Sequence, residues 1–141
     1  MILDNNFKLD HVSYAVRSTD NCIEKFKIIY PTVLAYKIFE QSQNVYVTYL
    51  TDKAESHKIE LVEPKDTPNP VENILKKNNI MIYHTGYKVE DFDYSIKLLR
   101  KNNFIMITEP FKTNFDKTVW ASHFYNSSFG IIEIMGNNNH G

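Results

Sequence analysis

The feature that most constrains the fold of this chain is an internal repeat with an offset of 73 positions. His84 follows His11 by 73 positions (84 − 11), and Glu133 follows Glu60 by the same distance (133 − 60). Similar hydrophobic patterns in two strands or helices would explain matched Val or Ile residues, but not two His and two Glu at equivalent positions. The repeat therefore predicts two copies of one structural unit.

The first half of the chain has the pattern of a strand, a helix and three further strands. Residues 9–16 alternate, so that His11 and Ser13 share one face of a strand. An apolar stripe follows, with Ser18 or Thr19 as the N-cap of a helix that ends before Pro31. Three segments rich in β-branched and aromatic residues come next, at 33–39, 44–51 and 57–64.

The second half repeats this order. A strand is predicted at 82–89 and a helix within 90–103, followed by strands at 104–111, 117–126 and 130–136. A linker helix is expected over about 69–79, because Asn69 can cap it and Pro70 suits its first position. The expected fold is α+β: two βαβββ modules, about 8–64 and 81–136, in a single domain of residues 1–141.

Composition narrows the partners of the chain. Its net charge of −1, without a basic run, argues against a nucleic-acid surface, which needs clustered Lys and Arg. Cys22 is the only cysteine, so no intrachain disulfide or Cys-based metal site is expected. No segment reaches 18 apolar residues, and no signal-like start is present. We expect a cytoplasmic protein that binds no membrane and whose partners are small molecules or a second copy.

The duplicated His and Glu residues indicate a metal centre. If a local twofold relates the two modules, His11, Glu60, His84 and Glu133 converge on one point. Two imidazoles and two carboxylates suit a single divalent ion such as Zn, Ni, Co, Mn or Fe. A metal would also explain Glu133 within the apolar run FGIIEIMG, because a buried carboxylate needs a compensating partner. The alternative is that Glu133 occupies a surface-facing strand position.

Four further residues are candidates for substrate binding: Ser13, Tyr46, Thr48 and His123. Tyr46 and Thr48 share one face of their strand, whereas Val47 and Tyr49 share the other, and only the strand register can decide which face lines a site. His123 has an alternative structural role, in which it packs among Trp120, Phe124 and Tyr125.

The segments DHVSYAV, KIELVEP, YHTGYKV and GIIEIMG resemble the metal-binding strands of the vicinal oxygen chelate superfamily, which has the glyoxalase and methylmalonyl-CoA epimerase fold. The resemblance covers about residues 8–136 and is greatest to the epimerase branch. It implies a cupped mixed sheet like that of glyoxalase and bleomycin-resistance proteins, a homodimer, and the same four residues as metal ligands.

The resemblance also implies a reaction. A metal-dependent isomerase, epimerase or lyase would act on a small acyl, keto or thioester substrate through a metal-stabilised enolate, with Glu133 as a catalytic base. The second base of the epimerases lies in a Glu-Gln-Gly-like turn, and here EQSQNV at 40–45 places Ser42 at that position. Either Glu40 reaches the site through a shifted loop, or the second base is missing and the chain is not a methylmalonyl-CoA epimerase.

Two alternatives remain open. The first is a ring-cleaving Fe(II) dioxygenase with a 2-His-1-carboxylate site, against which Glu60 counts as an additional ligand. The second is a metal-free module that sequesters a drug or another small molecule. The nine Tyr and nine Phe residues permit this function, but the presence of all four candidate ligands argues against it.

Overall fold

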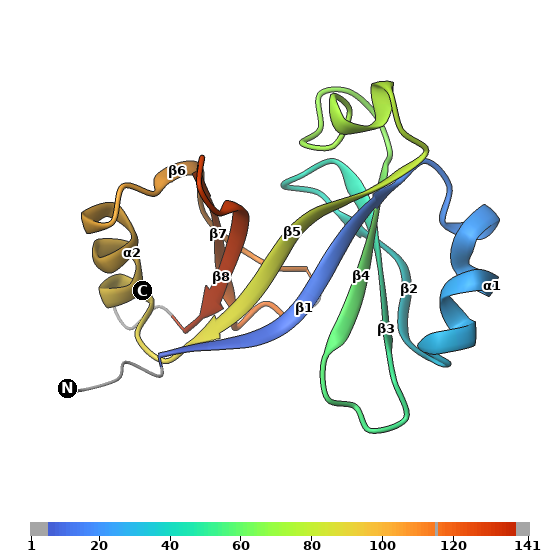
Figure 1. The fold of residues 1–141 in the computed structure, drawn as a ribbon, viewed down its shortest axis with the longest axis horizontal. Helices are drawn as coiled ribbons and strands as arrows, with labels where there is room; N and C mark the ends of the chain where they lie inside the picture. Colours follow the sequence, from blue (N-terminus) through green and yellow to red (C-terminus); the bar gives the residue numbers. More distant parts are fainter. Residues whose placement is uncertain (1–5, 115, 138–141) are drawn as a thin grey trace. The chain divides into compact units, whose positions relative to one another are not determined.

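The structure, a computed structural model, describes residues 6–114 and 116–137, and its elements follow the sequence repeat (Figure 1). The first module contains β1 (Phe7–Val16), α1 (Thr19–Ile29), β2 (Thr32–Glu40), β3 (Val45–Thr51) and β4 (Lys58–Pro64). The second contains β5 (Ile80–Val89), α2 (Phe92–Lys101), β6 (Ile105–Lys112), β7 (Trp120–Asn126) and β8 (Gly130–Gly136). Within this described part, no helix has the length and apolarity needed to cross a membrane.

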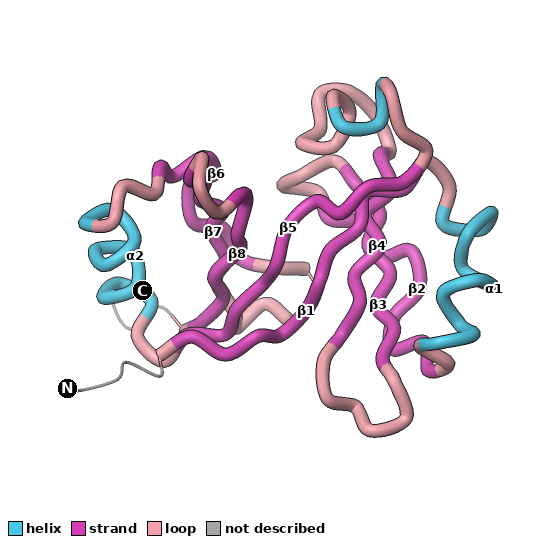
Figure 2. Tube along the Cα trace, viewed as in Figure 1, coloured by secondary structure: helices cyan, strands magenta, loops and turns pink. Residues whose placement is uncertain are grey.

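The strands form a mixed sheet in the order β2-β3-β4-β1-β5-β8-β7-β6 (Figure 2). The pairs β1/β4 and β5/β8 are parallel. The hairpin neighbours β2/β3, β3/β4, β6/β7 and β7/β8 are antiparallel. Each module therefore has the same internal pairing, and the predicted α+β fold with two βαβββ modules is confirmed.

The chain divides into two compact units whose boundaries fall inside β1 and β5. One unit contains residues 11–83, and the other contains the described residues of 1–10 and 84–141. The start of β1 thus packs with the second module: the rings of Phe7 and Tyr87 meet edge to face with centroids 6.4 Å apart. Asn6 Oδ1 also accepts hydrogen bonds from the backbone N–H groups of Glu90 and Asp91.

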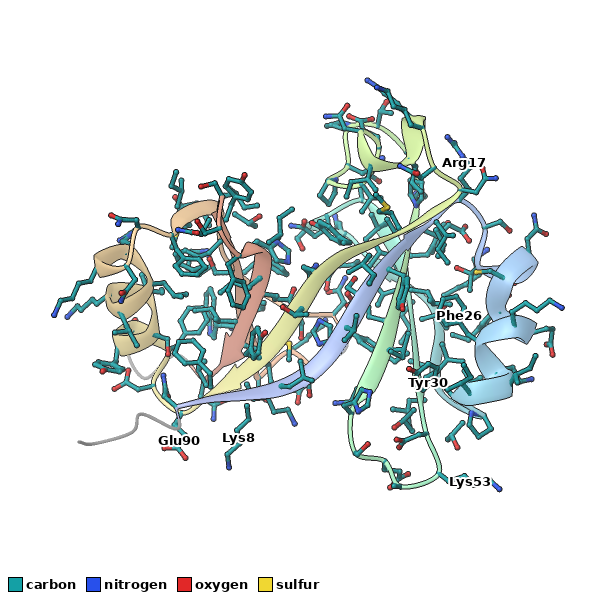
Figure 3. The ribbon with its side chains drawn as sticks, viewed as in Figure 1. Lys8, Arg17, Phe26, Tyr30, Lys53 and Glu90 are labelled. Atoms are coloured by element: carbon teal, nitrogen blue, oxygen red, sulfur yellow. The ribbon has the colours of Figure 1, made fainter. Side chains whose placement is uncertain are left out.

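The unit of residues 11–83 is built around an apolar cluster beneath α1. Val16, Leu50, Ile59 and Leu61 are buried at its centre. Phe26 of α1 and Tyr30, which directly follows the helix, point toward the strands and pack against this cluster (Figure 3). The helix begins where predicted, because the Ser18 hydroxyl accepts a hydrogen bond from the Asn21 N–H and acts as the N-cap.

The other unit has an equivalent core beneath α2. Its buried members are Val89, Phe92, Leu99, Phe124, Ile132 and Ile134. Three of these residues lie 73 positions after Val16, Ile59 and Leu61, so the repeat extends to the hydrophobic interior. The Asp91 side chain caps α2 by accepting from the Tyr94 N–H.

The linker helix expected over about 69–79 is reduced to one 3₁₀ turn, Ile74–Lys76. Asn69 does hold the start of this segment, since its side-chain oxygen accepts from the Val71 N–H. Asn78 then donates to the Ile74 carbonyl and occupies an acceptor that a longer helix would use. A segment of about ten residues is too short to nucleate a stable α-helix without packing along its whole length.

Candidate metal centre

The first half-site, His11, Tyr49 and Glu60, lies on three neighbouring strands of one unit. Glu60 of β4 pairs with Tyr49 of β3 and with Ser13 of β1, so the side chains of these residues share a face of the sheet. Glu60 Oε2 accepts a hydrogen bond of 2.7 Å from the Tyr49 hydroxyl. Glu60 Oε1 lies 3.8 Å from His11 Nε2. The carboxylate is therefore held between a phenol and an imidazole.

The second half-site, His84, His123 and Glu133, occupies the equivalent strands of the other unit. His123 of β7 pairs with Glu133 of β8, and its Nε2 lies 2.7 Å from Glu133 Oε2. On the other side of the ring, His123 Nδ1 lies 3.1 Å from the Thr108 hydroxyl of β6. The ring centroids of His84 and His123 are 5.2 Å apart. The carboxylate of Glu133 is thus oriented by an imidazole that is itself oriented by a hydroxyl.

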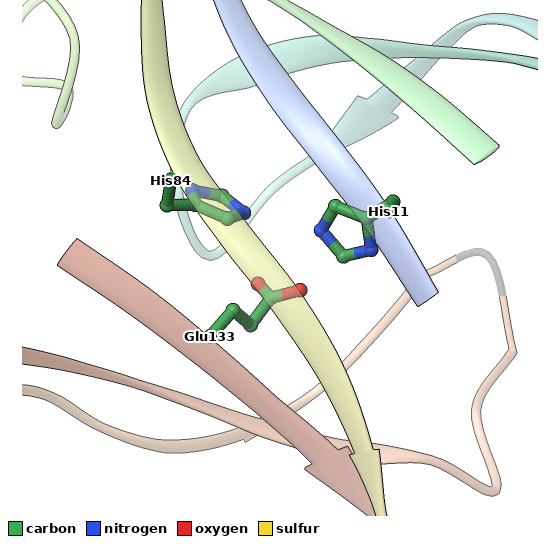
Figure 4. Close-up of side chains that lie close together, drawn as sticks. All are labelled: His11, His84 and Glu133. Carbon is green, nitrogen blue, oxygen red and sulfur yellow. The ribbon is translucent and has the colours of Figure 1, made fainter. Parts of the chain in front are cut away.

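Two of the four predicted ligands, His84 and Glu133, lie close enough to bind one metal ion. One donor atom of His84 lies within 4.8 Å of a carboxylate oxygen of Glu133 (Figure 4). Both side chains are buried, with relative exposures of 3% and 7%, and His11 of the first half-site is fully buried. Imidazole nitrogen and carboxylate oxygen together suit borderline divalent ions such as Zn and Fe(II). The residues present therefore fit a divalent metal.

Burial explains why the carboxylates at this site need defined partners. Glu60 is 5% exposed and Glu133 is 7% exposed. Removing an ionised carboxylate from water is costly unless hydrogen bonds and opposite charge compensate it. Tyr49 and His123 each supply one hydrogen bond. A divalent ion would supply the opposite charge.

Tyr46 and Thr48 lie on the face of β3 opposite Tyr49 and Glu60, and their role in substrate binding stays a prediction. In the β3/β4 register Tyr49 pairs with Glu60, whereas Tyr46 pairs with Glu63 on the opposite face. The fully buried Thr48 hydroxyl accepts from the backbone N–H of Lys37, which has a positive φ of 44° at a bulge in β2. Thr48 thereby satisfies a backbone donor that the bulge removes from the sheet ladder.

The other predicted site residues are Ser13, Glu40 and His123, and each lies in a different environment. Ser13 is fully buried beside Glu60. Glu40 ends β2, and its carboxylate accepts a hydrogen bond of 3.1 Å from the Ser42 hydroxyl. His123 belongs to the second half-site, where it contacts Glu133 directly.

Sequence reasoning missed Tyr49 and Thr108 as members of the half-sites. Tyr49 lies on one of the two faces of its strand that the sequence could not distinguish. Only the pairing with β4 shows that this face carries Glu60. Thr108 lies 73 positions after Ala35, so the repeat supplied no matching polar residue to draw attention to it.

Comparison with known proteins identifies the family of the chain. Residues 10–120 match the family model of the glyoxalase/bleomycin resistance protein/dioxygenase superfamily. Over 104 residues the chain is 28% identical to the mitochondrial methylmalonyl-CoA epimerase of Dictyostelium discoideum, covering 73% of this chain and 61% of that protein. The chain thus spans about three fifths of the length of this relative.

Solved structures show the same fold. The methylmalonyl-CoA epimerase of Mycobacterium tuberculosis matches with a TM-score of 0.82 at 19% identity, over 99% of this chain and 95% of that chain. A Streptomyces coelicolor methylmalonyl-CoA epimerase in complex with 2-nitronate-propionyl-CoA matches with a TM-score of 0.76 at 18% identity, over 92% of this chain and 96% of that chain. The chain belongs to the glyoxalase/bleomycin resistance protein/dioxygenase superfamily, which confirms the resemblance noted in its sequence.

Proposed function

We propose that the chain is a divalent-metal-dependent epimerase that inverts the carbon next to the carbonyl of a small acyl thioester. The observation that carries this proposal is the buried Glu133 carboxylate, which lies within 4.8 Å of a His84 nitrogen and 2.7 Å from His123 Nε2. The similarity to methylmalonyl-CoA epimerases favours an epimerase over a lyase. It also favours a substrate of the methylmalonyl-CoA class.

In this proposal His11, His84, Glu133 and Glu60 hold the metal. When bound, such an ion supplies a Lewis acid that polarises a carbonyl oxygen of the substrate. Support for this set of ligands comes from the strands, because each of the four residues lies on a β-strand that is paired within its own unit. A paired strand leaves the backbone of a ligand little freedom to move.

Glu133 is also the proposed base. A carboxylate next to an acidic C–H group can take the α-proton and return it, and burial removes the water that would compete. The hydrogen bond between His123 and Glu133 Oε2 fixes the plane of this carboxylate. His123 is therefore proposed to position Glu133 rather than to bind substrate directly.

Inversion needs a proton donor on the opposite face of the carbon, and Glu40 is the candidate for this second role. Its hydrogen bond from Ser42 shows that the two residues of this turn interact, although Ser42 occupies the place expected for the acid. With a single base, the chain would exchange the α-proton without inverting the carbon efficiently.

The proposal is tested with each pure epimer of methylmalonyl-CoA in D2O, using chain stripped of metal and then supplied with Zn, Co, Mn or Ni. We expect inversion with one solvent deuterium at the α-carbon, only when metal is present. Glu40→Gln should slow inversion more than it slows deuterium exchange, whereas Gln41→Glu in the same turn should leave both unchanged. Absence of both inversion and exchange with every metal would rule out the epimerase.

A second candidate is an Fe(II) dioxygenase, which would bind iron through two His and one carboxylate, and the close pair of His84 and Glu133 supplies two of these three donors. Glu60 beside His11 counts against it. Consumption of O₂ with a catechol-type substrate, dependent on ferrous iron, would support this candidate.

A small-molecule substrate and a homodimer are part of the same proposal. The Streptomyces relative was solved with an acyl-CoA analogue, which supports a thioester ligand here. Sedimentation velocity of the purified chain tests the dimer.

A further inference from the structure

We infer that Tyr49 is a positioning residue of the metal centre, which holds Glu60 through its hydroxyl and His11 through its ring. This inference rests on the proposed metal site. Tyr49 is half-buried on β3, opposite Glu60 of β4 in the antiparallel register. It touches both ligand residues of the first half-site and is not itself a ligand.

The hydroxyl fixes the orientation of the carboxylate. Its hydrogen bond of 2.7 Å occupies Glu60 Oε2, and Oε1 lies 3.8 Å from His11 Nε2. At neutral pH a phenol is an uncharged donor to a carboxylate. Tyr49 can therefore stabilise the ionised form of Glu60 without adding a charge that would repel a cation.

The ring of Tyr49 contacts the second proposed ligand of this half-site, His11. The rings of Tyr49 and His11 meet edge to face, with centroids 6.2 Å apart and an interplanar angle of 77°. This contact limits rotation of the imidazole about its side-chain bonds. Because ring and hydroxyl act on different ligands, their contributions can be separated by Tyr49→Phe, which keeps the ring and removes only the oxygen.

The other half-site supports a positioning role by its own geometry. There the residue opposite the glutamate is His123, which lies 2.7 Å from Glu133 Oε2. Both carboxylates are thus held at one oxygen by a side chain from the neighbouring antiparallel strand. The two donors have different rings, so the hydrogen bond to the carboxylate is the feature that the half-sites share.

The test measures Co²⁺ and Zn²⁺ affinity of the full chain by competition with a chromogenic chelator, together with the visible absorption spectrum of the Co²⁺ form. Tyr49→Phe should weaken affinity by about 10- to 100-fold, the usual effect of losing an outer hydrogen bond to a metal ligand, and should change the Co²⁺ spectrum. The matched control is Tyr36→Phe, which removes an exposed phenol that donates to Asp20. It should leave affinity and spectrum unchanged.

Tyr49→His, which copies the second half-site, should recover part of the lost affinity, and a purely structural role would not give this rescue. If Tyr49→Phe fails to fold, the metal affinity of Tyr49→His is compared with that of the wild-type chain instead. Wild-type affinity and spectrum in Tyr49→Phe, or no rescue by Tyr49→His, would overturn the inference alone. A wild-type chain that binds neither ion would overturn the proposed metal centre with it.

Discussion

The two half-sites share a scaffold but differ in the residue that holds each glutamate. In the first, the Tyr49 hydroxyl donates to Glu60, and in the second, the imidazole of His123 contacts Glu133. A phenol in this position only donates, whereas an imidazole nitrogen can donate or accept according to its protonation. The difference agrees with the proposed roles, in which Glu60 only binds the metal and Glu133 also exchanges a proton.

The backbones of the two modules share even their strand irregularities. Register shifts in β2 occur between Val33, Ala35 and Ile38. Register shifts in β6 occur between Met106, Thr108 and Phe111, each 73 positions later. A β-bulge changes the direction in which the following side chains point. Because the irregularities lie at equivalent positions, β2 and β6 have the same bends relative to β3 and β7. The modules therefore differ in chemistry at a few side chains and not in backbone design.

The largest expected effect on turnover is a difference between substitutions of Glu133 and Glu60. Glu133→Gln should lower turnover by about 10²- to 10⁴-fold, because it removes the proposed base. Glu60→Gln keeps an oxygen ligand and should act mainly through metal affinity, so that excess metal restores most of the turnover. Rate measurements at saturating metal distinguish them. Equal, unrescued losses in both variants would show that the half-sites are not functionally divided.

His123→Phe should have the next largest effect. It leaves a buried carboxylate without its imidazole partner, and we expect kcat to fall by about 10- to 100-fold with a smaller change in KM. His57→Phe is a suitable control, since His57 immediately precedes β4 and its ring packs against Tyr30. Turnover of His123→Phe equal to that of this control would remove His123 from the site.

Thr108→Val tests the outermost member of the second half-site. The Thr108 hydroxyl lies 3.1 Å from His123 Nδ1, whereas the equivalent residue of the first module, Ala35, has no hydroxyl. Loss of this hydrogen bond is worth about 1 kcal/mol, or roughly a fivefold decrease in kcat. In a His123→Phe background the same change should have no further effect, because its partner is gone. Additive losses would mean that Thr108 acts elsewhere.

The sequence predicted the strand-borne His and Glu residues because alternation and the 73-residue offset are local properties of each strand. It could not predict the equivalence of Tyr49 and His123, which are 74 positions apart (123 − 49). The hairpin from Tyr49 to Glu60 is one residue longer than that from His123 to Glu133, so the offset changes between strands. Pairing across a hairpin depends on its turn, which periodicity does not specify.

The same limit applies to two other expectations. Tyr46 and Thr48 were chosen from a strand with two similar faces, and the register places Tyr49, not these two residues, beside Glu60. The linker helix was predicted from its capping residues, which describe how a helix starts but not whether it can continue.

The smallest expected effect concerns the helices. Cys22 of α1 and Ser95 of α2 are 73 positions apart (95 − 22), and both donate to a backbone carbonyl of the preceding turn. Burial raises the pKa of the Cys22 thiol, with smaller contributions from the Glu63 and Asp20 carboxylates. Since the thiolate is the reactive form, Cys22 should react with iodoacetamide more slowly than a free thiol at neutral pH. Its rate should keep rising above the pH at which a free thiol levels off, as followed by mass spectrometry. The urea-unfolded chain provides the reference, and an identical pH profile in folded and unfolded protein would contradict burial as the cause.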